Sequence, residues 1–315
     1  MPASRSTSHP ANVVVTGAGG GVGSALVARL DSLGYRVFAG IRRDEARAAL
    51  PSSPGVVPVV FDTTGEASVE AAASWIATET GDAGLQALVN VAGLMRQGPL
   101  ELTSAATLRQ QFDVTVLGTM TVTRAFLPLL RLGQGRVVNV GAVTGRVTMP
   151  FAGPISAAET ALESLSDALR MELRHQGVAV SLVELGGMDT TLFAKAGAAA
   201  EQDIGSAAPA LQAIYASALE AVGATFAKQK LSSPEVAVKS IVKALTDRSP
   251  DARYLAGRDA RLIAKLRRLP DGLRDRLILR ALGIKPAMFR RGGGDQPLGV
   301  GASSSAATMS GSAQA

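Results

Sequence analysis

The chain has 315 residues, no cysteine and a formal net charge of +6, which suits one large α/β domain or two small ones. The absence of cysteine excludes disulfides, thiolate catalysis and Cys-based zinc sites. His9 and His175 are the two histidines and lie far apart in the sequence, so no metal site is expected. No secretory signal and no run of about 18 apolar residues occurs, so we expect a cytoplasmic protein without a transmembrane segment.

Short β-branched apolar runs alternate with helical patterns along the chain. Strands are expected at residues 12–15, 36–39, 56–61, 87–91, 136–140, 178–185 and 254–257. Helices are expected at residues 25–33, 68–78, 105–132 and 156–175, and another helix begins at the Ser233-Pro234 cap. This alternation predicts the α/β class: a single domain with a doubly wound, seven-stranded parallel sheet of the Rossmann type.

The domain is expected to cover residues 12–284, between a disordered N-terminus at 1–11 and a disordered, Gly/Ser/Ala-rich tail at 285–315. Residues 189–231 are rich in alanine and helical in pattern, with no strand among them. Such a segment is typical of a lid over a pocket.

A basic segment near the C-terminus carries a net positive charge larger than that of the whole chain. From Arg258 to Arg291, eleven Lys/Arg stand against three Asp, a local net charge of +8. Its leucines recur at helical spacing and predict an amphipathic helix pair on the domain, broken at Pro270, with a solvated basic face. These leucines are Leu262, Leu266, Leu269, Leu273 and Leu277. A membrane-surface or acidic-partner role is the alternative. Specific nucleic-acid binding is not expected, because the basic segment has no aromatic residue for base stacking before Phe289.

A glycine-rich turn, Thr16-Gly17-Ala18-Gly19-Gly20-Gly21-Val22-Gly23, follows the first strand and opens a helix. Gly17 permits the tight turn, Gly21 lets the backbone approach a pyrophosphate, and Gly23 lets the helix pack against the strand. After the second strand, Arg42 and Arg43 follow the place where an acidic residue would bind the ribose 2′-OH, which favours NADP(H) over NAD(H). As alternatives to nucleotide binding, the glycines would serve helix–strand packing alone and the arginines would be solvated charges of a loop.

The T-G-x3-G-x-G spacing of this turn resembles that of the short-chain dehydrogenase/reductase family, most closely members acting on retinoid- and steroid-like substrates. Asn90-Val91-Ala92-Gly93 is similar to the family's N-N-A-G, and Asp62-Thr63 to the pair whose Asp holds the adenine amino group. The resemblance implies an NADP(H) site, with the nucleotide as reactant or as structural element. Its residues would be Thr16, Gly17, Gly21, Val22, Gly23, Arg42, Arg43, Asp62, Thr63, Asn90, Ala92 and Gly93.

The catalytic positions of the family hold other residues in this chain. The family's serine, tyrosine and lysine correspond to Ala142, Ile155 and Glu159, and the asparagine of the preceding long helix corresponds to Thr115. In the family, tyrosine exchanges a proton with the substrate oxygen, lysine lowers the pKa of that tyrosine, serine fixes the oxygen and asparagine orders a relay water. The resemblance therefore implies that ordinary carbonyl reduction is absent.

Glu159 is the candidate replacement group. In a largely apolar cavity, burial would raise its pKa and let it act as general acid or base near neutrality. The alternative is a passenger in an inactive site. Ser156 and Thr144 are expected to point elsewhere, and Tyr215 is expected to pack within the lid.

Three functions remain open from the sequence. A repurposed enzyme would perform cyclisation, dehydration or isomerisation of a small apolar substrate without net redox chemistry. A pseudoenzyme would sense NADP(H) or partner a catalytic homologue, and an oxidoreductase would need a non-standard proton donor.

The family also implies a homodimer or homotetramer, in which the helices at 105–132 and 156–175 form a four-helix bundle.

Overall fold

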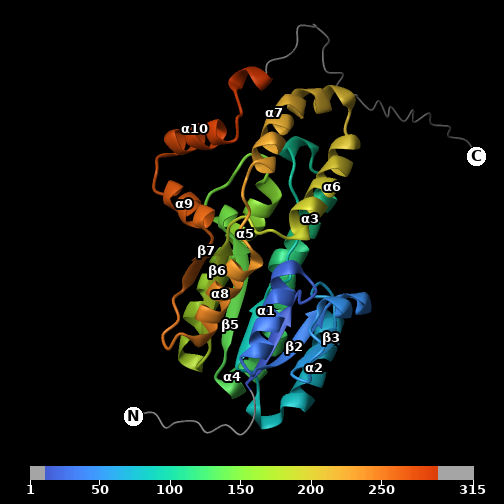
Figure 1. Ribbon diagram of the computed structural model, residues 1–315, viewed down its shortest axis with the longest axis vertical. Coiled ribbons are helices and arrows are strands. Elements are labelled where there is room, and N and C mark those ends of the chain that lie inside the picture. The colour runs from blue at the N-terminus through green and yellow to red at the C-terminus, as the bar shows by residue number, and fades with distance from the viewer. Residues whose placement is uncertain (1–10, 290–315) are drawn as a thin grey trace, which may run out of the picture.

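A parallel sheet with helices on both faces forms the body of the protein (Figure 1), as described for residues 11–289 of a computed structural model. Its strands run in the order β3-β2-β1-β4-β5-β6-β7, and all neighbouring pairs are parallel. Their bounds are β1 (Asn12–Thr16), β2 (Arg36–Ile41), β3 (Val56–Val60), β4 (Ala87–Asn90), β5 (Arg136–Ala142), β6 (Ala179–Leu185) and β7 (Arg253–Ala256). The predicted seven-stranded, doubly wound sheet is confirmed.

The central strands are buried on both faces, which explains their continuous β-branched runs. On one face, α1 (Gly21–Ser32) and α8 (Pro234–Thr246) bury Val13 and Val15 of β1. On the other face, α2 (Glu66–Thr80), α4 (Thr119–Gly133) and α5 (Gly153–Leu173) bury Val14.

The strand order reverses between β1 and β4, because β1 lies between β2 and β4. In a doubly wound sheet, the loops at the carboxyl ends of the strands separate at such a point and leave a crevice for a ligand. The glycine-rich turn follows β1, Asn90 ends β4 and Ala142 ends β5. The fold therefore brings the predicted nucleotide residues and the vacated catalytic positions to one edge of the sheet.

The single long helix expected at 105–132 is interrupted by a wider turn. The structure has α3 (Ala105–Phe112), a π-helical turn (Asp113–Gly118) and then α4. Hydrophobic periodicity continues through such a turn, so the sequence did not reveal it. The π-turn contains Thr115, one of the vacated positions.

The expected lid consists of two helices, α6 (Thr191–Gly205) and α7 (Pro209–Ala227). The basic segment also forms two helices, α9 (Arg258–Leu266) and α10 (Asp271–Ala281), separated as predicted at Pro270. A small apolar cluster joins α10 to α7 and to the segment after β5, through Ile278, Leu282, Val222 and Val147. Among the described residues, no helix is both long enough and apolar enough to span a bilayer.

Two expectations for the C-terminal region are corrected. Leu262, Leu273 and Leu277 are 65%, 48% and 42% exposed, so three of the five leucines face outward, not toward the domain. Residues 285–289, assigned to the tail, include a 3-10 turn (Pro286–Phe289) whose Phe289 ring meets that of Tyr215 at 6.3 Å. The remaining segments expected to be disordered, 1–10 and 290–315, lie outside the described residues.

Candidate functional site

The glycine turn has the geometry that an anion site requires. Gly17 adopts a φ of +64°, and a Cβ there would lie 2.7 Å from Cα of Ala92. A Cβ on Gly23 would lie 2.2 Å from the carbonyl oxygen of Gly17, so α1 packs directly on the turn. No side chain caps the N-terminus of α1 and no acidic residue lies in its first turn. Its N-terminal amides and helix dipole therefore suit phosphate groups.

Gly21 lies against Thr190, which is not among the residues predicted for the nucleotide site. A Cβ on Gly21 would lie 2.8 Å from Cγ2 of Thr190. Thr190 is the N-cap of α6 and accepts a hydrogen bond from the backbone of Leu192. The N-cap of α6 therefore lies against the glycine turn, so the segment expected to form the lid and the predicted nucleotide site share one contact. Val22, the next predicted site residue, is largely buried.

Hydrogen bonds hold the ends of β1, β4 and β5 together. Thr16 Oγ1 accepts from the backbone N–H groups of Val91 and Ala92, both at 3.0 Å. The Asn90 amide donates to Thr123 Oγ1 at 3.1 Å and to Asn139 Oδ1 at 2.9 Å. Asn90 Oδ1 is buried and has no hydrogen-bond partner among the described residues. Thr16 and Asn90 thus link the carboxyl ends of these three strands.

Gly93 follows these residues, and its surroundings are open. A Cβ there would meet only the carbonyl oxygen of Val91, at an ordinary 3.7 Å. This predicted site residue therefore shows no steric requirement for glycine within the protein itself.

The residues expected around the adenosine lie after β2 and β3. Arg42 and Arg43 are exposed at the end of β2. Asp62 Oδ1 accepts hydrogen bonds from the backbone N–H and the hydroxyl of Thr64, at 2.9 and 2.8 Å. Burial opposes ionisation of Asp62, but the Thr64 hydrogen bonds and the charge of Arg42 outweigh it and lower the pKa of this carboxyl. Thr63 lies against Gly118, the last residue of the π-helical turn that contains Thr115.

Three of the vacated positions lie near the carboxyl end of β5. Ala142 is the last residue of β5, and Ile155 and Glu159 lie in the first two turns of α5. Ile155 is buried and carries no titratable group, so it has no proton to exchange. The resemblance would align this buried apolar side chain with the family's tyrosine.

The fourth vacated position, Thr115, is part of a buried polar network. Gln111 Nε2 donates to Thr115 Oγ1 at 2.8 Å and to the carbonyl oxygen of Leu94 at 2.8 Å. Gln111 itself is fully buried and accepts from the backbone N–H of Arg96. Gln111 was not recognised from the sequence, because nothing distinguishes it there from an exposed helical glutamine.

Glu159 is a buried carboxyl group, only 9% exposed. Its Oε2 accepts a hydrogen bond of 2.9 Å from the backbone N–H of Ala142. A Cβ on Gly141 would lie 2.4 Å from the same oxygen, and one on Gly145 would lie 2.9 Å from the Glu159 carbonyl carbon. Burial raises the pKa of Glu159 to about 8, the Ala142 hydrogen bond opposes this shift, and the charge of Glu184 adds to it.

Glu184 and Arg146 form a buried ion pair beside Glu159. In the parallel register Gly141 is the partner of Glu184, so both residues face the α5 side of the sheet. Arg146 donates from Nε and one terminal nitrogen to the two Glu184 oxygens, each at 2.5 Å. The Glu184 side chain is 2% exposed. The sequence signal was a lone acidic residue in a largely apolar strand, which indicates a buried, paired charge.

Other hydroxyl groups near the vacated site differ in their partners. Ser156 Oγ and Thr144 Oγ1 are buried without a hydrogen-bond partner among the described residues. Tyr215 donates to Glu101 Oε2 at 2.7 Å, and its ring meets Phe151 edge to face. The hydrogen bond to Glu101 raises the pKa of Tyr215, with burial as a smaller cause. Tyr215 of α7 thus contacts residues outside the segment expected to form the lid, and its partners account for the hydroxyl and the ring without a catalytic role.

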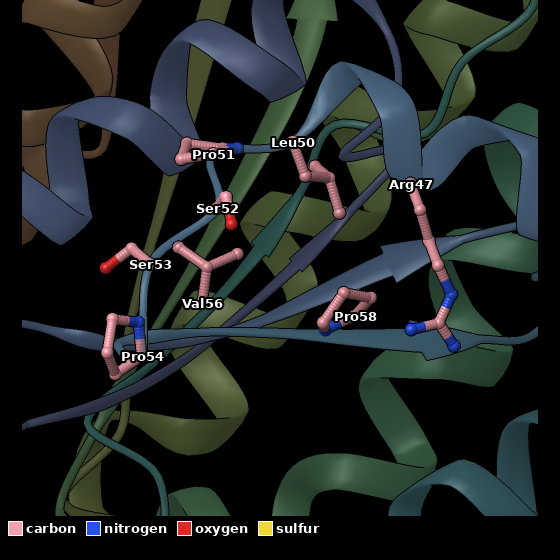
Figure 2. Close-up of a pocket in the computed structure, with 8 residues that line it drawn as sticks. All are labelled: Arg47, Leu50, Pro51, Ser52, Ser53, Pro54, Val56 and Pro58. Carbon is pink, nitrogen blue, oxygen red and sulfur yellow. The ribbon is translucent and has the colours of Figure 1, made fainter.

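A hollow of about 450 Å³ lies elsewhere, at the β3 edge of the sheet. Figure 2 shows the Pro51–Pro54 loop along one side of it and Arg47 on the other. Arg47 is already paired with Asp44, and the other lining side chains are apolar or small hydroxyls. This hollow carries no acid–base group and is separate from Glu159.

Comparison with known proteins identifies relatives over most of the chain. A family model described as short chain dehydrogenase matches residues 11–201. The chain is 34% identical to 17-beta-hydroxysteroid dehydrogenase type 6 of Bos taurus, over 85% of this chain and 88% of that enzyme. It is 36% identical to the 3-amino-tetrahydro-pyrrolizinone reductase of Xenorhabdus hominickii, over 58% of this chain. That match spans 64% of the reductase, slightly less than two thirds of its length.

A solved structure supports the same assignment. The short-chain dehydrogenase of Burkholderia cenocepacia in complex with NADP superposes with a TM-score of 0.65 at 28% identity, over 88% of this chain and 99% of that one. The expected nicotinamide-nucleotide site is thereby confirmed as a feature of the family. Sequence, fold and site geometry agree, and the chain belongs to the short-chain dehydrogenase family.

Proposed function

We propose that the protein binds NADP(H) and performs acid–base chemistry on a small apolar ligand, with Glu159 as the proton donor and acceptor. The observation that carries this proposal is the buried Glu159 carboxyl at the position of the family's lysine, with a pKa raised by burial to about 8. A group with that pKa is protonated in part near neutrality and can both give and take a proton. The proposed reaction has no net redox change.

The glycine turn and the two arginines support NADP(H) as the nucleotide. The uncapped N-terminus of α1 would hold the pyrophosphate, and Arg42 and Arg43 would hold the 2′-phosphate. In the family the bound nucleotide supplies a hydride donor or acceptor. In this chain we propose that it completes the wall of the pocket, because Ala142 and Ile155 cannot assist transfer to a carbonyl oxygen.

The proton chemistry follows from the hydrogen bond to Ala142. Because that N–H donates to Oε2, the hydrogen bond favours the form of neutral Glu159 that carries its proton on Oε1. In an isomerisation, Oε1 would give this proton to one atom of the ligand and the carboxylate would take a proton from another. In a dehydration, the donated proton would leave with the hydroxyl group as water, and the carboxylate would take a proton from the neighbouring carbon as the double bond forms. Neither reaction requires an oxidant or a reductant.

Deuterium exchange tests the proposal directly. The protein with NADPH would be incubated in heavy water with small cyclic ketones and allylic alcohols, and the ligands analysed by mass spectrometry. With the wild type we expect a deuterated ligand or a product of unchanged oxidation state, while the nicotinamide absorbance stays constant. In Glu159→Gln we expect neither deuteration nor product. The exposed Glu172 on the same helix provides the control variant Glu172→Gln, which should behave as wild type. Oxidation of NADPH in step with product would instead identify an oxidoreductase with a non-standard donor.

A pseudoenzyme is the second candidate. Glu159 accepts a hydrogen bond from Ala142, and Gly141 and Gly145 fit tightly around it. These contacts also suit a carboxyl group with a purely structural role, which favours a pseudoenzyme. In that case NADPH would still bind, but no ligand would exchange protons in either wild type or Glu159→Gln. The protein would then sense NADP(H) or support a catalytic homologue.

We also propose a homodimer or homotetramer assembled through α4 and α5. Leu117, Leu132 and Met171 on or next to these helices are 58%, 52% and 61% exposed, which leaves an apolar face for such an interface. Light scattering of the full chain should show at least a dimer, and Leu117→Arg with Met171→Arg should reduce its mass to that of a monomer. A monomeric wild type at micromolar concentration would refute the assembly.

A further inference from the structure

The outward faces of α9 and α10 combine exposed leucines with exposed cations. On α9, Arg258, Arg261, Leu262 and Lys265 are all exposed, whereas Ala260 is fully buried. Their spacing of i, i+3, i+4 and i+7 places all four on one side of the helix. Leu262 is 65% exposed and therefore stands among three positive charges.

The same arrangement recurs on α10. Leu273, Arg276, Leu277 and Arg280 are exposed at the same spacing, whereas Ile278 points inward to the cluster with Val222 of α7. We call these two sets of residues the Arg/Leu face. It consists of Arg258, Arg261, Leu262, Lys265, Leu273, Arg276, Leu277 and Arg280.

Acidic residues of these helices are directed away from the Arg/Leu face or are already paired. Asp259 accepts a hydrogen bond of 2.6 Å from the backbone N–H of Gly187, and so lies between α9 and the segment after β6. Asp271 and Asp275 both pair with Arg274. The five cations of the face form no ion pair with any residue between Ala11 and Phe289. The face thus presents uncompensated positive charge.

A membrane surface fits this combination better than the other partners. Anionic headgroups attract juxtaposed Lys and Arg side chains, and leucines between them can enter the boundary between headgroups and acyl chains. A second copy of the same face would bring five further cations against these five, which is repulsive. The face is an outer one, since α9 and α10 lie on the outside of the molecule beyond β7 and α7 (Figure 1).

We propose that the Arg/Leu face binds the surface of membranes rich in anionic lipids, with its cations at the phosphates and its three leucines in the interface. The protein would lie on such a membrane without spanning it. This attachment is independent of the chemistry of Glu159, so either proposal can fail without the other.

Flotation of the full chain with lipid vesicles tests the proposal. We expect binding to vesicles of phosphatidylcholine with phosphatidylglycerol, weak binding to phosphatidylcholine alone, and release at high ionic strength. Each cation near an anionic surface contributes about fivefold to partitioning, so Arg261→Glu, Lys265→Glu and Arg276→Glu together should weaken binding at least about 100-fold. Leu262→Ser with Leu277→Ser should also weaken binding, and the remaining binding should be more sensitive to salt.

Matched control variants separate the face from general surface effects. Leu33, at the end of α1, is 42% exposed like Leu277, so Leu33→Ser removes an equally exposed leucine elsewhere. Arg29→Glu reverses an exposed charge on α1. Both should float as wild type, and circular dichroism should show every variant folded.

Four results would overturn the proposal. Equal binding to charged and neutral vesicles, or unchanged binding of both face variants, would exclude the Arg/Leu face as the membrane site. Binding to polyglutamate without binding to vesicles would indicate an acidic protein partner. A smaller mass of the leucine variant in light scattering, without vesicle binding by wild type, would show that the face joins two copies of the chain.

Discussion

The backbone N–H of Ala142 donates a 2.9 Å hydrogen bond to Oε2 of Glu159, from the end of β5 to the second turn of α5. The sequence resemblance assigns these two positions to the family's serine and lysine. In this chain the backbone of Ala142 holds the side chain of Glu159 in place. The bond favours the ionised carboxyl, but burial outweighs it, and the pKa of Glu159 rises to about 8.

This raised pKa predicts a pH-dependent stability. The pKa is about 8 in the folded protein and 4.5 for an ordinary carboxyl, so the folded state holds the proton more tightly. The contribution is fully present below the lower value and is lost as pH rises through the upper one, by at most about 1.4 kcal/mol per pH unit. Glu159→Gln stays neutral, so the decline in its urea midpoint over this window should be shallower. An equal decline in Glu159→Gln and the surface control Glu172→Gln would contradict the shift.

The nucleotide preference depends on two exposed arginines. We expect calorimetric titration to show tighter binding of NADPH than of NADH. Arg42→Ala with Arg43→Ala should weaken NADPH binding roughly 10- to 100-fold, the usual contribution of hydrogen bonds to a charged group, and leave NADH binding nearly unchanged. Arg47→Ala removes a neighbouring exposed arginine that already pairs with Asp44, and serves as control. Tighter binding of NADH by wild type would reverse the interpretation.

The vacated catalytic positions predict that standard ketones and alcohols of the family give no nicotinamide turnover above background. Acid–base and oxyanion groups contribute factors of about 10²–10⁴ each, so their joint loss removes measurable rates. Ala142→Ser, Ile155→Tyr and Glu159→Lys, together with Thr115→Asn, should restore weak oxidation of NADPH. Ordinary enzymatic rates in the wild type would show that the assignment of these positions is wrong.

The buried pair of Arg146 and Glu184 should matter for stability. Arg146→Met leaves the Glu184 carboxylate buried without its partner, which typically costs about 3–5 kcal/mol. Replacing both residues, by Arg146→Met and Glu184→Leu, should recover much of this loss. Arg36→Met breaks a more exposed pair with Glu79 and should cost about 1 kcal/mol or less. Urea unfolding measures all three, and equal effects of Arg146→Met and Arg36→Met would contradict the prediction.

The sequence predicted the sheet well because parallel strands are buried on both faces and appear as β-branched runs such as Val13-Val14-Val15. The glycine turn was equally readable, since its spacing is tied to a strand before it and a helix after it. The π-turn around Thr115 was not readable, because one extra residue in a turn leaves the hydrophobic pattern almost unchanged.

Contacts between distant side chains were beyond the sequence. The pairing of Arg146 with Glu184 depends on the register that sets Gly141 opposite Glu184, and no local pattern encodes that register. The outward leucines of α9 and α10 were missed for a related reason. Periodicity shows that Leu262 and Leu273 share a face with their neighbours, but not whether that face meets the domain or the solvent.

Gly141 has a consequence for the family as a whole. A side chain there would occupy the space of the Glu159 carboxyl, since even a Cβ would come within 2.4 Å of Oε2. Glutamate at position 159 and glycine at position 141 are therefore a linked pair. Among relatives that carry glutamate at the position of the lysine, we expect glycine to accompany it on β5, and this pairing would recognise such proteins from sequence alone.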